Sequence, residues 1–172
     1  MKAYFTFETE RLYLKPTCKD DALFLLELMN TPKWHRFIGD RSIKTVEDAE
    51  KYIEEKMTPQ LERLGYSNYT VIRKSDGEKL GTCGLYDREG LEGIDIGFAF
   101  LPQFEGQGYA FESANRIKEA AIHEFHLDLI NAITVKDNLP SQRLLEKLGL
   151  TFVKTIQIPN DPEELLLYQW KV

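Results

Sequence analysis

The chain lacks the sequence features that mark several functional classes. Neither a G-x-x-x-x-G-K-[ST] loop nor a G-x-G-x-x-G after an early strand occurs, which argues against Walker-type and Rossmann-type nucleotide binding. The three histidines have no metal-ligand spacing with cysteines or carboxylates, so no metal site is expected. Only two cysteines occur, Cys18 and Cys83, and no Ser-His-Asp arrangement is recognisable. We therefore expect no metal chemistry, and neither cysteine needs to be catalytic.

An excess of basic residues and a long apolar run are also missing. The net charge is −6, which argues against a nonspecific nucleic-acid partner and would attract cationic amines or basic peptides. No signal peptide and no apolar stretch of membrane length is recognisable, so we expect a cytoplasmic protein without a membrane partner. With 172 residues, 42% of them hydrophobic, the chain suits one domain over residues 1–172. The oligomeric state stays open, a homodimer included.

A glycine-rich segment, Glu-Gly-Gln-Gly-Tyr-Ala at 105–110, is the most informative feature that the chain does have. It lies between an extended apolar run at 94–101 and an apolar-periodic helix at 111–122. Glycines let a ligand approach the backbone closely, and a helix N-terminus offers unpaired N–H groups and about half a positive charge. The segment therefore suggests a phosphate-binding turn, although similar turns occur in α/β proteins that bind nothing there.

This segment resembles motif A, Q/R-x-x-G-x-G/A, of the GNAT superfamily of acyl-CoA-dependent N-acyltransferases. In the register that starts at Glu105 the last four positions fit and the first is an acid. A second register, 103–108, fits every letter but ends before the helix can begin, so we prefer the first. The stretches 9–16 and 20–22 look like the opening of the RimJ/RimL-like branch, and 138–150 is similar to motif B.

The resemblance implies a mixed α/β GNAT fold, with a largely antiparallel central sheet flanked by helices. It implies an N-acetyltransferase in which a primary amine attacks acetyl-CoA directly, so no enzyme nucleophile is needed. The implied acceptor is a protein or peptide N-terminus of the ribosomal-protein type. A small amine such as a polyamine or an aminoglycoside is the alternative acceptor, and a noncatalytic acyl-CoA-binding module is the alternative from another class.

The resemblance also implies which residues hold acetyl-CoA. Phe98, Ala99 and Phe100 would pair with the pantetheine amides as an added strand does, and an N–H near Phe100 would face the thioester oxygen. Asn138 would hydrogen-bond the cofactor arm, although an Asn before a proline-started helix is equally a helix cap. The pyrophosphate would be held by the backbone of Glu105, Gly106, Gln107, Gly108, Tyr109, Ala110 and Phe111.

Catalytic roles are less well marked. Ser141 is a candidate to protonate the departing thiolate, or an ordinary first-turn serine. Asp95 is a candidate base for the amine proton, or a hydrogen-bonded strand acid. Some GNAT enzymes use a tyrosine of the motif B helix as the acid, but this helix has leucines there. Trp34 and His35 fall in the segment that borders the acceptor pocket in the family.

Local patterns predict the order of the elements. We expect Thr17 to cap a helix with Asp20 three residues on, Thr45 to cap another with Asp48, and Pro59 to kink or end that second helix. Residues 30–42 are expected to be irregular. Extended segments are expected at 4–15, 67–73, 79–86, 94–101, 129–135, 152–158 and 165–170, with a short helix from Pro140 to near Gly149.

Overall fold

The computed structural model describes residues 2–172 and contains one mixed sheet of eight strands in the order β1-β2-β3-β4-β5-β6-β8-β7. Every neighbouring pair is antiparallel except β5 and β6, which are parallel. The strands are β1 Phe7–Glu8, β2 Leu12–Pro16, β3 Asn68–Arg73, β4 Lys79–Asp87, β5 Ile94–Phe100, β6 Leu129–Val135, β7 Thr151–Ile156 and β8 Leu165–Lys171. The expected extended segment at 4–15 is thus two short paired strands, and the other expected strands are confirmed within a few residues.

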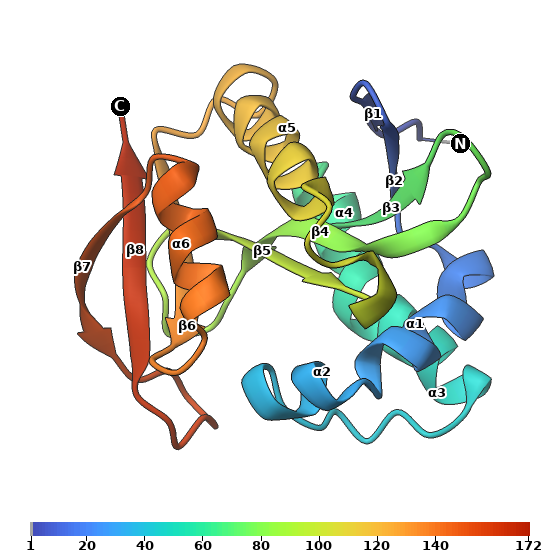
Figure 1. Cartoon of the computed structure of the whole chain (residues 1–172), viewed down its shortest axis with the longest axis horizontal. Coiled ribbons are helices and arrows are strands. Elements are labelled where there is room, and N and C mark those ends of the chain that lie inside the picture. The colour runs from blue at the N-terminus through green and yellow to red at the C-terminus, as the bar shows by residue number, and fades with distance from the viewer. Residues whose placement is uncertain (1) are drawn as a thin grey trace.

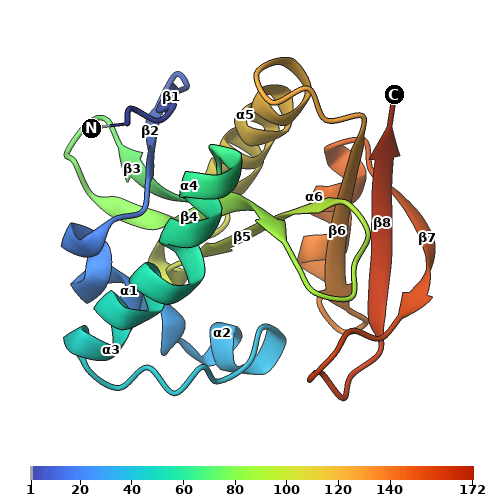
Figure 2. The same cartoon turned by 180° about the vertical axis from the view of Figure 1, so that it is seen from behind.

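Helices cover both faces of this sheet (Figures 1 and 2). α5 and α6 lie on one face, whereas α3 and α4 lie on the other. The helices are α1 Ala22–Met29, α2 Pro32–Phe37, α3 Val46–Tyr52, α4 Thr58–Leu64, α5 Tyr109–His123 and α6 Leu139–Lys147, with a π-helical turn at Ile53–Met57. None of the helices in residues 2–172 is long and apolar enough to cross a membrane.

The main core lies between α5 and the central strands. Ala114, Ile117 and Ala121, which share one face of α5 as the 3.6-residue period predicts, are fully buried. Cys83 on β4 is also fully buried there, and burial raises the pKa of its thiol to about 12. This position keeps the thiol protonated, consistent with a residue that only fills core volume.

Two caps bear on the helix predictions. Thr45 Oγ1 accepts a hydrogen bond from the Asp48 N–H at 3.0 Å, and an Asp48 carboxylate oxygen accepts from the Thr45 N–H, so that capping box is confirmed. The first helix instead begins one residue later than predicted, with the Cys18 N–H bound to Asp21. The physical reason is that the Thr17 hydroxyl is already hydrogen-bonded to Thr70 on β3, at 2.9 Å.

Two further predictions were wrong in part. Pro59 does not end its helix: it occupies the first turn of α4, and the π-helical turn just before it lets the chain continue, with Thr58 N–H bonded to Ile53 C=O. Residues 30–42 are not wholly irregular, because α2 begins after Thr31, whose hydroxyl caps the Trp34 N–H. Pro32 and Pro59 each lie in the first turn of a helix, where the N–H that proline lacks would have no acceptor within the helix.

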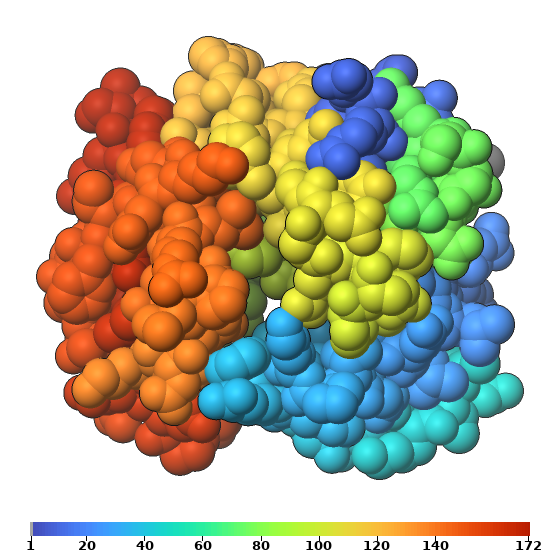
Figure 3. Space-filling view, in the orientation of Figure 1, coloured from blue at the N-terminus to red at the C-terminus, as the bar shows by residue number. Residues whose placement is uncertain are grey.

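The parallel pair β5 and β6 is the feature that positions the site. The two strands are paired only at Ile94 with Ile130 and at Asp95 with Asn131. Beyond Asp95, β5 stays paired with β4 up to Phe100 but leaves β6. Figure 3 shows the surface hollowed between α6 and the loop before α5, above α2. The sheet therefore opens into a wedge at this point.

Candidate functional site

A cavity of about 830 Å³ fills this wedge. Its walls come from β5, β6, α6, α2 and the loop that leads into α5. The size falls in the range of small-molecule sites, and the lining combines apolar strands with polar groups at its two ends.

One end of the cavity is the N-terminus of α5. Gly108 is the N-cap residue with a φ of 85°, and Gly106 has a φ of 74°, so both adopt a backbone that glycine allows without strain. The next three N–H groups, those of Tyr109, Ala110 and Phe111, have no acceptor within the helix. Together with the helix dipole they form a site suited to an anion such as a phosphate.

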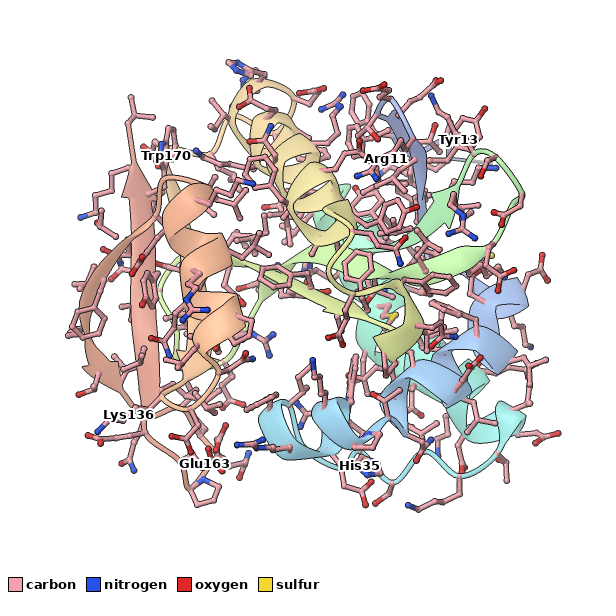
Figure 4. All side chains as sticks on the ribbon, in the orientation of Figure 1. Arg11, Tyr13, His35, Lys136, Glu163 and Trp170 are labelled. Atoms are coloured by element: carbon pink, nitrogen blue, oxygen red, sulfur yellow. The ribbon has the colours of Figure 1, made fainter. Side chains whose placement is uncertain are left out.

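Arg11, at the start of β2, holds this loop in place (Figure 4). Its Nη1 donates to the carbonyl of Gln107 at 3.0 Å, and its guanidinium lies over the ring of Tyr109, 4.4 Å from the centroid. The side chain of Glu105 is paired with Lys33. The acid in the first position of the motif is thus neutralised locally. Gln107 is exposed and is not among the residues that line the cavity.

The outer half of β5 forms one long wall. Phe98, Ala99 and Phe100 line the cavity, and their backbone is paired with β4 on one side only. On the side that faces β6, no strand in residues 2–172 completes their hydrogen bonding. Such an open edge can accept an extended chain that carries amides.

The start of α6 forms the opposite wall. Asn138 Oδ1 accepts from the Ser141 N–H at 3.3 Å, so the capping interpretation of Asn138 holds for that atom. The Asn138 Nδ2 has no hydrogen-bond partner in residues 2–172, and both Asn138 and Ser141 line the cavity. One side chain can therefore cap the helix and still donate to a ligand.

Asp95 lies at the other end, where β5 and β6 begin to separate. Its side chain is 1% exposed and lines the cavity. Both carboxylate oxygens accept from Nε of Arg88, at 3.0 Å each. Burial raises the pKa of Asp95 to about 6, against the opposing effect of the Arg88 charge. A carboxyl with this pKa can exchange a proton near neutral pH.

The two residues expected near the acceptor differ in their positions. Trp34 lines the cavity, and its indole Nε1 is buried without a hydrogen-bond partner in residues 2–172. His35, labelled in Figure 4, is exposed and does not line the cavity. Successive side chains of a helix point about 100° apart, so these neighbours on α2 point in different directions.

Sequence reasoning missed Arg88 and Tyr86. Tyr86 lines the cavity and donates its hydroxyl to Asn68 Oδ1 at 2.5 Å. A Cβ on Gly97 would lie 3.0 Å from the Tyr86 ring, and one on Gly84 would lie 2.9 Å from its hydroxyl. Two glycines inside adjacent strands were the available signal, because interior strand glycines mark a close approach.

Comparisons with known proteins agree with this geometry. Residues 11–151 match the family model described as an acetyltransferase (GNAT) domain. The uncharacterized N-acetyltransferase YnaD of Bacillus subtilis is 29% identical over 142 residues, which are 83% of this chain and 80% of YnaD.

Solved structures share the fold along the whole chain. An acetyltransferase from Agrobacterium tumefaciens superposes with a TM-score of 0.81 at 22% identity, covering 100% of this chain and 99% of its own. RimL, described as a ribosomal L7/L12 alpha-N-protein acetyltransferase in complex with coenzyme A, superposes with a TM-score of 0.84 at 14% identity, covering 98% of both chains.

The described residues fit acetyl-CoA on three independent features. These are the free amides at the start of α5, the open backbone edge of β5, and a cavity that connects them. The expected GNAT fold with a mixed, mostly antiparallel sheet is confirmed. The chain belongs to the GNAT family of acetyltransferases and is an N-acetyltransferase that uses acetyl-CoA.

Proposed function

We propose that this enzyme acetylates the α-amine of a peptide or protein N-terminus, as a RimJ/RimL-like member of the family. The observation that carries the proposal is the single cavity that joins an anion-binding helix terminus to the Asp95–Arg88 pair. The similarity in fold to RimL, whose name gives a protein α-amine as acceptor, supports this acceptor class. Such an acceptor is available in the cytoplasm, where we expect the protein to act.

The length of β5 fits this use of the cavity. From Asp95 to Phe100 the strand advances five residues, or about 17 Å at 3.3 Å per residue. An extended pantetheine arm along that edge would connect phosphates at the start of α5 with a reacting group near Asp95. Acetyl-CoA supplies the acetyl thioester.

The residues of this chain would then divide the work. The N–H groups of 109–111 hold the pyrophosphate, and the β5 edge at 98–100 holds the pantetheine amides. Asn138 Nδ2 donates to the cofactor arm, and the Ser141 hydroxyl delivers a proton to the departing sulfur as it takes one from solvent. Asp95 accepts the proton that the amine releases.

The need to deprotonate the acceptor amine favours an N-terminal α-amine over a lysine side chain. An α-amino group has a pKa of about 7.7–8.0, against about 10.4 for lysine, so it reaches its neutral form with less help. A carboxylate with a pKa of about 6 is a weak base, and it suits the easier of these two deprotonations.

Charges in the cavity disfavour the polyamine alternative. Arg36, Arg41 and Arg88 line the cavity, and a polycation would be repelled by them. We therefore retain the peptide N-terminus as the acceptor class.

The experiment has two stages. Calorimetric titration with acetyl-CoA, with ATP and NAD as controls, tests the cosubstrate, and we expect binding of acetyl-CoA alone. Release of free thiol is then followed with a panel of N-terminal peptides, spermidine and an aminoglycoside. Turnover with peptides above the others supports the proposal. Turnover with small amines alone would show that the acceptor is a small amine and not a peptide N-terminus. Binding of acetyl-CoA without turnover on any amine would favour a noncatalytic acyl-CoA-binding module.

A further inference from the structure

The cavity differs in charge from the protein as a whole. The whole chain carries a net charge of −6, yet five basic and three acidic side chains line the cavity. Two of the three acids are neutralised by partners, since Asp95 is bound to Arg88 and Glu105 to Lys33. An acceptor in this cavity therefore meets an excess of positive charge.

Two of the basic side chains that line the cavity, Arg36 and Arg41, belong neither to the loop before α5 nor to its first turn. Arg36 and Arg41 form no ion pair with any carboxylate in the part of the chain that the structure describes. They come from α2 and the segment after it, whereas the proposed phosphate site is at the start of α5. Arg88 lies beside Asp95, about 17 Å along β5 from Phe100, so it is too far along the strand to serve the same phosphates.

Arg88 is held in one orientation with four of its five N–H donors unused. Its Nε is committed to both oxygens of Asp95, and its guanidinium lies against the Tyr86 ring, 5.2 Å from the centroid. Its Nη1 and Nη2 have no hydrogen-bond partner in residues 2–172. The side chain is 34% exposed and lines the cavity. These two nitrogens form a fixed fork that matches the two oxygens of a carboxylate.

We propose that the acceptor carries a carboxylate a few bonds from its primary amine, and that the Nη1 and Nη2 of Arg88 bind this carboxylate. The proposal rests on the N-acetyltransferase function given above and specifies the chemistry of its acceptor. Asp95, next to Arg88, receives the amine end of the same acceptor. Asp95 and Arg88 thus present one negative and one positive group to an acceptor whose amine is positive and whose carboxylate is negative.

Two kinds of acceptor share this chemistry. A peptide with an acidic first residue offers a side-chain carboxylate and stays within the acceptor class proposed above. A free amino acid offers its α-carboxylate and would replace that class. Both place a carboxylate near a primary α-amine.

The test uses pairs of acceptors that differ only in the carboxylate. One pair is glutamine-amide and free glutamine, and the other is a peptide that begins with Glu and the same peptide that begins with Gln. In the peptide pair the amine and the size are kept, so kcat/KM reports the contribution of the charge. In the free pair the size is kept and the amine of the amide is less basic, which favours the amide, so a preference for free glutamine still reports the carboxylate. We expect the carboxylate member of at least one pair to be preferred by about tenfold or more, because a charge-assisted hydrogen-bonded pair is lost in the other member.

The variant Arg88→Lys tests the residue. Lysine keeps a cation near Asp95 but removes the planar fork. We expect the preference within the pair to fall by about tenfold while acetyl-CoA still binds. Arg63→Lys is the matched control, because Arg63 is paired with Asp87 at 2.8 Å and does not line the cavity. Its preference should equal that of the wild type. Both members of a pair are assayed on one preparation, so a general loss of stability cancels in the ratio.

The outcomes separate this inference from the proposed function. Preference in the free pair identifies an amino acid, and preference in the peptide pair identifies an acidic N-terminus; either supports the inference. Equal turnover of carboxylate and carboxamide members by the wild type overturns the inference and leaves the N-acetyltransferase function standing. An unchanged preference in Arg88→Lys also overturns it. The wild-type comparison needs no variant, so a failure of Arg88→Lys to fold leaves the inference testable.

Discussion

Gly108→Glu should remove acetyl-CoA binding, because it changes the loop at the start of α5 in two ways. Gly108 has a φ of +85°, and a Cβ there would lie 3.2 Å from the Nη2 of Arg11, the side chain that holds the carbonyl of Gln107. Left-handed backbone costs a non-glycine residue about 1–2 kcal/mol. The new carboxylate would also stand near the bound pyrophosphate. At roughly 5 Å and an effective dielectric constant of about 20, the repulsion is about 3 kcal/mol, or more than a hundredfold in affinity.

Gly77→Glu is the matched control for the backbone strain. Gly77 has a φ of +74° in the turn between β3 and β4, and no atom lies within 4 Å of its added Cβ. Both variants should lose about 2–8 °C of thermal stability, since 1 kcal/mol corresponds to about 2–4 °C in a domain of this size. Only Gly108→Glu should lose acetyl-CoA affinity, measured by calorimetry. Wild-type affinity in folded Gly108→Glu would show that the phosphates are not held at this loop.

Three other substitutions test separate parts of the structure. Asn138→Asp keeps an oxygen that caps the Ser141 N–H but removes the amide donor. The thermal stability should therefore be unchanged, whereas the acetyl-CoA affinity measured by calorimetry should fall by about threefold or more. Unchanged affinity would show that Asn138 is only a helix cap. With a pKa of about 6, Asp95 is ionised above that pH, so kcat/KM should fall as the pH drops through about 6. Asp95→Asn should lose this pH dependence together with most of the activity, measured as release of free thiol. If the variant keeps the decrease in kcat/KM below pH 6, another group is the base. Thr45→Ala removes the hydroxyl that caps the Asp48 N–H and should lower the free energy of unfolding by about 1 kcal/mol in urea titration, with no change in acetyl-CoA affinity.

The fold could largely be predicted, because its signals are local or belong to a motif. Thr45 and Asp48 form the expected capping box, and the apolar face of α5 is buried as its period requires. The failures came from contacts distant in sequence or from local backbone adjustment. Thr17 did not cap its helix because its hydroxyl is bound to Thr70, which lies 53 residues away. Pro59 did not stop its helix because a π-helical turn precedes it. Neither effect is visible in a short window of sequence.

The site divides into a half that sequence could indicate and a half that it could not, for a physical reason. The half proposed to bind acetyl-CoA is mostly backbone: the amides at the start of α5 and the open edge of β5, with the side chains of Asn138 and Ser141 added at the start of α6. Glycine spacing reports on backbone directly, and a departure such as Glu105 is harmless when its charge is taken by Lys33. The half proposed to bind the acceptor is made of side chains from separate elements, with Arg36 on α2 and Arg88 after β4. Their meeting in one cavity depends on the separation of β5 from β6, which no local pattern encodes. A family can therefore be identified from the first half, whereas the acceptor cannot be derived from local patterns in the second.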